Sequence, residues 1–150
     1  MLSLGIDIGS TTSKCVLLES GTTIRAEALT AGGIGTKGPE QTVAQTLEKA
    51  GVSADDITST VVTGYGRASW KSADRTISEL TAHGLGNHFL FPDARTIIDI
   101  GGQDAKVIEL GNDGRMVNFV MNDKCAAGTG RFLEVMANVL RIPIGELETM

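Results

Sequence analysis

The feature that most constrains the fold is a short element that occurs twice in the sequence. Residues 4–9 read Leu-Gly-Ile-Asp-Ile-Gly, and residues 97–102 read Ile-Ile-Asp-Ile-Gly-Gly. In each copy an apolar strand ends in an aspartate, and a glycine two positions later lets the backbone turn sharply beside the carboxylate. One such element is typical of an ordinary strand exit, but two copies favour a duplicated α/β fold with a phosphate-binding loop in each half.

Polar residues follow the first copy and form the first half of the candidate site. After Asp7 and Gly9, the chain offers hydroxyl groups, backbone N–H groups and one ammonium to phosphate oxygens, in Ser10, Thr11, Thr12, Ser13 and Lys14. We predict that Gly9 and these five residues bind the phosphates of a nucleotide. Asp7 is predicted to be catalytic and to hold Mg²⁺ through water, because this ion prefers oxygen ligands and keeps several waters.

The second copy continues differently and completes the candidate site. Asp99 is followed by Gly101, Gly102, Gln103 and Asp104, which add an amide and a second carboxylate. We predict that Asp99, Gly101, Gly102 and Gln103 bind the cofactor, and that Asp99 shares the hydrated Mg²⁺ with Asp7. Gln103 and Asp104 are predicted to be catalytic, since either can orient an attacking water. Two such elements can close on one nucleotide.

Two common nucleotide-binding motifs are absent from the sequence. There is no Gly-x-x-x-x-Gly-Lys-Ser/Thr loop, and no Gly-x-Gly-x-x-Gly follows the first strand. Dinucleotide binding is therefore disfavoured.

Hydrophobic periodicity and turn residues indicate the order of elements. Strands are expected over 3–8, 13–18, 23–29 and 58–63, with a helix from Pro39 to Gly51 before the last of them. A helix over 76–83 then completes the first half. The second half is predicted to contain a strand over 95–100, a hairpin of strands 106–110 and 116–121 about Asn112-Asp113-Gly114, and an amphipathic helix that Pro143 ends.

The return of the strand pattern predicts two lobes. We expect a first lobe over residues 1–93 and the beginning of a second over 94–150, with the boundary at Phe91-Pro92-Asp93. The glycine-rich stretch 31–38 is expected to be the most flexible. After Pro143 a new helix begins without a capping glycine or a polar tail, so we expect the chain to be truncated at its C-terminal end.

Cys125 is a candidate ligand, whereas Cys15 is not. Cys125 lies in Cys-Ala-Ala-Gly-Thr-Gly before the last helix, where unpaired N–H groups and the helix dipole stabilise a thiolate, a cluster or a phosphate. By itself this thiol can be a core residue, a nucleophile or a ligand. Cys15 lies in an apolar run and is predicted to pack inside a strand. Two cysteines in such unlike settings argue against a disulfide and fit a reducing compartment.

Charge and hydropathy limit the possible partners. The formal net charge is −5 and no basic stripe is present, so a nucleic-acid surface is not expected. No apolar segment is long enough to span a bilayer, and the first residues run directly into a strand. A cytoplasmic location without a membrane or nucleic-acid partner is predicted.

Four motifs, in this order, resemble those of one family in the actin-like ATPase superfamily. They occupy residues 5–14, 63–67, 98–104 and 122–131. Together they resemble the activator ATPase of 2-hydroxyacyl-CoA dehydratases and the related activators of benzoyl-CoA reductase. The resemblance runs through essentially the whole chain. It implies an α/β fold of the actin-like, ribonuclease H-like kind, with a complete first lobe and the beginning of a second.

The resemblance also implies an ATPase coupled to electron transfer in anaerobic metabolism. In this family a homodimer holds one [4Fe–4S] cluster between its subunits, and ATP binding and hydrolysis change the angle between the helices that point at the cluster. A low-potential electron then passes to the dehydratase or a related reductase. ATP/ADP, Mg²⁺ and a ferredoxin- or flavodoxin-type electron donor are implied, and Cys125 matches the first cluster ligand of each subunit.

The sequence departs from the family pattern in two places. The family's second cluster cysteine and its adenine-binding glycines are not in this chain, and Cys15 lies in the wrong element to replace that cysteine. We therefore expect that the chain as given cannot complete the cluster site. The identity of the acyl-CoA is not expected to be encoded here, since the activator does not touch it.

Two other functions remain open at this stage. In a sugar or amino-sugar kinase of the same superfamily, Asn122-Asp123 would bind a hydroxyl and supply the general base; a non-enzymatic ATP-binding module is the third possibility. Neither gives Cys125 a task. Outside the motifs, His83 and His88 lack the partners of a zinc site and are predicted to be structural. Arg67 is expected either to contact phosphate or a partner protein, or to stabilise its own loop.

Overall fold

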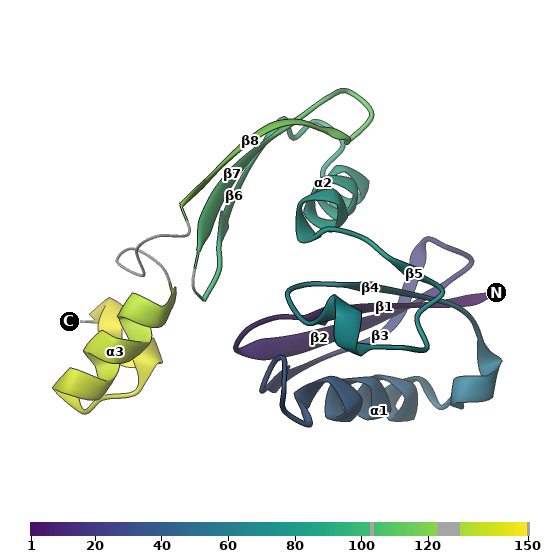
Figure 1. Ribbon diagram of the computed structural model, residues 1–150, viewed down its shortest axis with the longest axis horizontal. Coiled ribbons are helices and arrows are strands. Elements are labelled where there is room, and N and C mark those ends of the chain that lie inside the picture. Colours follow the sequence, from purple (N-terminus) through teal and green to yellow (C-terminus); the bar gives the residue numbers. More distant parts are fainter. Residues whose placement is uncertain (103, 123–129, 150) are drawn as a thin grey trace. The chain divides into compact units, whose positions relative to one another are not determined.

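A computed structural model of the protein describes residues 1–102, 104–122 and 130–149 (Figure 1). By its contacts the chain divides into two units, Met1–Ala82 and His83–Met150. The division falls inside helix α2 (Glu79–Leu90), before the boundary expected at Pro92. The two ends of this region contact different units. Ile77, just before the helix, donates a hydrogen bond to Val62 in the first unit, whereas Gly84 packs near Leu110 and Gly114 in the second.

The first unit is built on a five-stranded sheet with the order β3-β2-β1-β4-β5. Strands β1 (Leu2–Ile8), β2 (Thr12–Glu19) and β3 (Thr23–Ala31) form the antiparallel meander that the sequence predicts. Strand β4 (Ile57–Thr63) then pairs with β1 in parallel. Strand β5 (Arg75–Thr76) was not predicted, because two residues are too few to show an alternating pattern.

Helix α1 (Gly38–Ala50) covers one face of this sheet (Figure 1). Pro39 lies in its first turn, and Gly51 ends it in the left-handed conformation with a φ of 68°. Beneath the helix, Ile6, Ile8 and Leu17 are almost completely buried, and Val43 and Leu47 pack against that core from the helix. Complete burial of one such side chain contributes about 1.5–3 kcal/mol. Trp70, the only tryptophan, also packs here.

The opposite face of the sheet carries Asp7 and Lys14. Side chains alternate between the two faces of a strand, so Ile6 and Ile8 point into the core while Asp7 points away from it. Asp7 and Lys14 line a hollow of about 550 Å³ together with Val16, Leu29, Val61 and Thr63. The strand ends that carry the first candidate loop therefore lie beside an open, partly apolar surface.

The second unit contains a three-stranded antiparallel sheet of β6 (Thr96–Ile100), β7 (Ala105–Leu110) and β8 (Met116–Asn122). The predicted hairpin turn is confirmed, with Gly114 at a φ of 74°. Helix α2 begins later than predicted and continues to Leu90, because Thr76 pairs within β5 and the Ser78 hydroxyl accepts a hydrogen bond from the Thr81 N–H. The helix α3 (Gly130–Leu140) agrees with the predicted amphipathic helix.

Short 3-10 helices complete the chain. They are η1 (Ala54–Asp56), η2 (Arg67–Ser69) and η3 (Ile144–Thr149). The new helix expected after Pro143 is thus of the tighter 3-10 kind. Among the described residues, no helix combines the length and the apolar character needed to cross a membrane.

Candidate phosphate-binding loops

The first candidate loop connects β1 to β2. The Gly9 N–H donates to the carbonyl oxygen of Thr12 at 3.0 Å, which closes a tight turn. Ser10 and Thr11 are half-buried in this turn, and their hydroxyl groups make no hydrogen bond within the described part of the chain. A loop of this kind presents hydroxyl groups and turned backbone to an anion.

The glycine-rich segment 31–38 holds this loop in place, although its composition predicted flexibility. The carbonyl oxygens of Gly9 and Thr11 accept hydrogen bonds from the N–H groups of Ile34 (2.9 Å) and Gly32 (2.8 Å). A Cβ atom at position 33 would overlap the carbonyl oxygen of Gly9, so only glycine allows this approach. Gly33 therefore allows segment 31–38 to pack closely against the backbone of the first loop.

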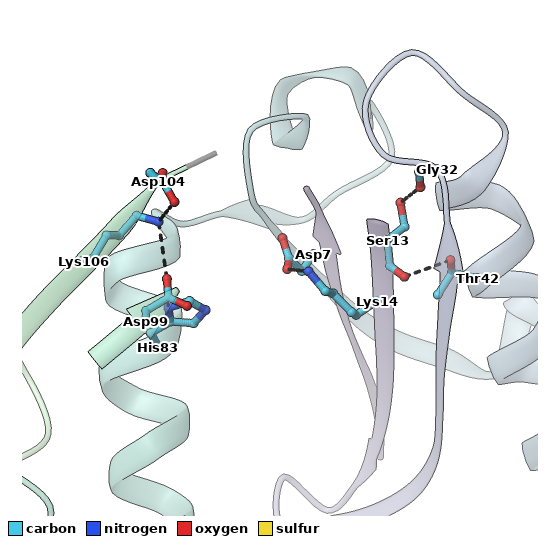
Figure 2. Close-up of polar contacts among 9 residues, drawn as sticks. All are labelled: Asp7, Ser13, Lys14, Gly32, Thr42, His83, Asp99, Asp104 and Lys106. Carbon is cyan, nitrogen blue, oxygen red and sulfur yellow. Dashed lines mark hydrogen bonds and ion pairs between the residues drawn. The ribbon is translucent and has the colours of Figure 1, made fainter. Parts of the chain in front are cut away.

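Asp7 and Lys14 form an exposed ion pair beside the loop. They are directly opposite each other in the β1–β2 ladder, and Lys14 Nζ lies 3.1 Å from Asp7 Oδ2 (Figure 2). The Lys14 side chain is 45% exposed and the Asp7 side chain 30%. Because exposed pairs contribute only about 0–1 kcal/mol, the Lys14 ammonium can leave Asp7 at little cost.

The Thr-Gly-Tyr-Gly-Arg motif at 63–67 supports Asp7 from the neighbouring strand end. Gly64 has a φ of +86°, and a Cβ atom there would overlap both a carboxylate oxygen of Asp7 and the carbonyl oxygen of Ile8. Arg67 donates from Nη1 to the carbonyl oxygen of Gly64 at 3.0 Å. Of the two roles considered for Arg67, this contact is the loop-stabilising one.

The second candidate loop, between β6 and β7, repeats the geometry of the first. The Gly101 N–H donates to the carbonyl oxygen of Asp104 at 2.8 Å, as Gly9 does to Thr12. The Gly101 carbonyl oxygen accepts a hydrogen bond from a distant backbone, the N–H of Gly130 at the start of α3 (3.0 Å). Asp99 and Lys106 are opposite each other in the β6–β7 ladder, as Asp7 and Lys14 are in β1–β2. The duplication seen in the sequence therefore extends to hydrogen bonds and ion pairs.

Burial distinguishes the second ion pair from the first. The Lys106 side chain is only 4% exposed, and its Nζ lies 2.7 Å from Asp104 Oδ1 and 3.3 Å from Asp99 Oδ2 (Figure 2). Removing one partner of a buried pair typically costs about 3–5 kcal/mol, because the other charge is left without compensation. Both carboxylates are predicted from the sequence as site residues, whereas Lys106 is not.

His83 lies beside Asp99 and was also missed. Its Nδ1 is 3.3 Å from Asp99 Oδ2, although no hydrogen bond forms there. Nothing in the sequence near His83 indicates this neighbour, since the histidine belongs to α2 and the aspartate to β6. Only the packing of the helix beside the sheet brings them together.

Ser13 occupies a different place from the other predicted residues of its loop. It is completely buried, on the face of β2 opposite to Lys14, and its hydroxyl donates to the carbonyl oxygen of Gly32 at 2.8 Å (Figure 2). We therefore assign the Ser13 side chain to holding segment 31–38. Gln103 and Cys125, two further predicted site residues, lie outside the described residues.

Cys15 is the packed strand residue that the sequence predicts. It is 3% exposed, and burial raises the pKa of its thiol, against the smaller opposing effect of a hydrogen bond with Thr46. Such a thiol is unreactive and unsuited to ligate iron.

The described residues contain no group of three or more His, Cys, Asp and Glu side chains placed to bind a metal directly. Asp7 in the first unit and Asp99 in the second each keep a partly exposed carboxylate. The first loop fits phosphate, with free hydroxyls and an exposed ammonium.

The fold is that of the actin-like ATPases. A solved structure of the ethanolamine utilization protein EutJ from Carboxydothermus hydrogenoformans matches 99% of this chain and 60% of its own, with a TM-score of 0.65 at 16% identity. This likeness concerns the fold alone, and it agrees with the fold class predicted from the duplicated loops.

The family follows from the whole sequence. The chain belongs to the BadF/BadG/BcrA/BcrD ATPase family, whose model matches residues 4–150. It is 52% identical to the (R)-2-hydroxyglutaryl-CoA dehydratase activating ATPase of Acidaminococcus fermentans, over 97% of this chain and 56% of the relative. The family expected from the four motifs is thereby confirmed.

A solved relative carries a nucleotide analogue. The activator of the 2-hydroxyisocaproyl-CoA dehydratase from Clostridium difficile, with bound ADPNP, is 52% identical and has a TM-score of 0.95, covering 98% of this chain and 55% of that one. The present chain thus spans about half the length of the relatives it matches.

Proposed function

We propose that the protein is an ATP-hydrolysing activator that delivers a low-potential electron to a 2-hydroxyacyl-CoA dehydratase or a related acyl-CoA reductase. The names of its relatives and its membership of an ATPase family support this proposal. The observation that carries it is the repeated loop, in which a glycine turn and a cross-strand Asp–Lys pair occur in both units. The two relatives serve different dehydratases at equal identity, so the acyl-CoA is left open.

The two loops would share the work of binding MgATP. In the first, Gly9, Ser10, Thr11 and Thr12 would bind phosphate oxygens, and Lys14 would turn from Asp7 toward them. In the second, Gly101, Gly102 and Gln103 would do the same. Asp7 and Asp99 would hold a hydrated Mg²⁺, which neutralises phosphate charge, and Asp104 or Gln103 would orient the attacking water.

A contact in the second unit suggests how the nucleotide could act at a distance. The Gly130 N–H, at the first residue of α3, donates to the carbonyl oxygen of Gly101 in the second loop. A shift of this loop on ATP binding would therefore be passed to α3. Cys125 lies a few residues before α3 in the sequence and would supply one ligand per subunit to a [4Fe–4S] cluster shared in a homodimer, with a further ligand from outside this chain.

The test is an activation assay with the natural gene product, purified without oxygen. The protein is mixed with a 2-hydroxyacyl-CoA dehydratase, a low-potential reductant standing in for a ferredoxin or flavodoxin, and ATP, and dehydration of the acyl-CoA is followed. We expect activation with ATP and none with ADPNP. Iron and acid-labile sulfide are measured on the same samples.

Two cysteine variants make the assay specific. Cys125→Ala should lose iron, sulfide and activation, whereas Cys15→Ala, which changes a buried thiol on β2, should retain all three. ADP release that depends on an added sugar, with no effect on a dehydratase, would instead establish the kinase alternative.

A further inference from the structure

In the second unit, one buried cation contacts the two aspartates of the candidate loop. Lys106, Asp104 and Asp99 come from neighbouring positions of the β6–β7 hairpin, and the Lys106 ammonium contacts a carboxylate oxygen of each aspartate. Lys106 and Asp104 are almost completely buried, while Asp99 is 22% exposed. A lysine ammonium enclosed in this way cannot reach a ligand without breaking both contacts.

The equivalent lysine of the first unit is in the opposite situation. Lys14 has the same register to Asp7, but it is 45% exposed and contacts that carboxylate alone among the described side chains. The same pair of residue types is thus loose in one copy and enclosed in the other. The second copy also has Asp104 in contact with its lysine, where the counterpart in the first copy is Thr12 by the shared turn geometry.

We propose that Lys106 is a positioning residue, which holds the carboxylates of Asp99 and Asp104 close together and directs them toward a hydrated Mg²⁺ and the attacking water. Two carboxylates near each other repel, and one ammonium between them removes that repulsion while leaving a net charge of about −1 for the metal. Lys106 itself does not touch the nucleotide. This inference rests on the proposed function, since it concerns the same MgATP site.

The experiment compares Lys106→Met with Lys71→Met, which removes an exposed lysine whose ammonium donates to the carbonyl oxygen of Ala68. Affinity for ADP is measured by calorimetry with Mg²⁺ and with EDTA. In the wild type and in Lys71→Met, Mg²⁺ should strengthen ADP binding. In Lys106→Met we expect this gain to shrink by about 10–100-fold, the usual effect of removing a group that orients metal-binding residues. Affinity for ADP in EDTA should not change.

A second variant separates positioning from folding. Asp104→Asn and Asp104→Asn/Lys106→Met carry the same amide at position 104, and in the double variant the partly exposed Asp99 has no ammonium partner but keeps access to water. The proposal expects a further loss of Mg²⁺-dependent ADP affinity in the double variant. In nucleotide-free crystal structures, the Asp99 carboxylate should keep its wild-type position in Asp104→Asn. It should be displaced from that position in Asp104→Asn/Lys106→Met.

The outcomes distinguish this inference from the proposed function. If the wild type binds no ADP with or without Mg²⁺, the proposed function fails and this inference fails with it. If the wild type binds MgADP, but folded Lys106→Met and the double variant keep the full effect of Mg²⁺ and an unmoved Asp99, the lysine is merely structural and only this inference is overturned.

Discussion

At the scale of residues, burial decides what a duplicated pair can do. Asp7–Lys14 and Asp99–Lys106 have the same spacing and the same ladder register. Water reaches the first pair, so its attraction is weak and the lysine is available to a ligand. The second pair is enclosed with Asp104, so its lysine is held in place. Chemical identity alone would have assigned both lysines the same role.

Replacement of Lys14 should affect nucleotide binding and leave stability nearly unchanged. If Lys14 binds phosphate as proposed, Lys14→Met removes a charge-assisted contact worth about 1.5–3 kcal/mol, so ADP affinity should fall about tenfold or more. The free energy of unfolding should change by less than about 1 kcal/mol, because the lost ion pair is exposed. Calorimetry and urea unfolding measure the two quantities.

Arg25→Met is the matched control for that experiment. Arg25 of β3 and Glu19 of β2 form an exposed pair of the same length, 3.1 Å, on the next antiparallel strand pair of the same sheet. The control should change neither ADP affinity nor stability appreciably. Equal ADP affinities for Lys14→Met and Arg25→Met would remove Lys14 from the phosphate site.

At the scale of elements, the first loop depends on a segment that contributes no predicted ligand. Residues 32–34 bind the loop through two backbone hydrogen bonds, and the buried Ser13 hydroxyl fastens the same segment to β2. Thr42 of α1 in turn donates to the carbonyl oxygen of Gly38, the last residue of the glycine-rich segment, at 2.7 Å. Helix α1 therefore contacts the glycine-rich segment 31–38, and this segment holds the first loop in place.

Gly33→Ala should therefore disturb the first loop. The added methyl group would overlap the Gly9 carbonyl oxygen, and overpacking of this kind costs about 1–3 kcal/mol. We expect a lower midpoint in urea unfolding and weaker ADP binding, since the loop must move away. Gly86→Ala, in helix α2 with nothing near the new atom, should be neutral or stabilise by up to about 1 kcal/mol. Unchanged ADP affinity in Gly33→Ala would show that the segment does not support the loop.

At the scale of the whole molecule, the chain repeats one glycine turn with a cross-strand Asp–Lys pair in each of its two units. Each unit has its own sheet and its own turn, and each was identified from the same short motif. The proposed function requires both loops to serve one ATP. The alternative is that each loop binds a nucleotide of its own.

The number of nucleotides bound per chain tests that requirement. We expect one ADP per chain in calorimetry with Mg²⁺, and Asp7→Asn and Asp99→Asn should each weaken that single binding event. Two independent sites would instead give two ADP per chain, and each variant would then abolish one event and leave the other unchanged. Glu19→Gln, on the exposed pair with Arg25, serves as a neutral control.

Much of the fold and of the site was predictable because it is local. Strand alternation, Pro39 and Gly51 around α1, and the Asn112-Asp113-Gly114 turn determine their elements through short-range sterics and hydrogen bonds. The repeated Asp–x–Gly motif likewise indicated both loops, and four motifs together indicated the family. These features are set by neighbours in the sequence, so they can be recognised there.

Tertiary structure alone decided which side chains face the site. Ser13 and Lys14 are adjacent in sequence, yet one is buried against segment 31–38 and the other lies beside Asp7. Glycines expected to make 31–38 flexible instead allow it to pack on the Gly9 turn. His83 and the enclosed Lys106 reach Asp99 through packing across elements. The sequence by itself determined the backbone turns and their chemistry, whereas burial, which depends on distant segments, determined the role of each charge.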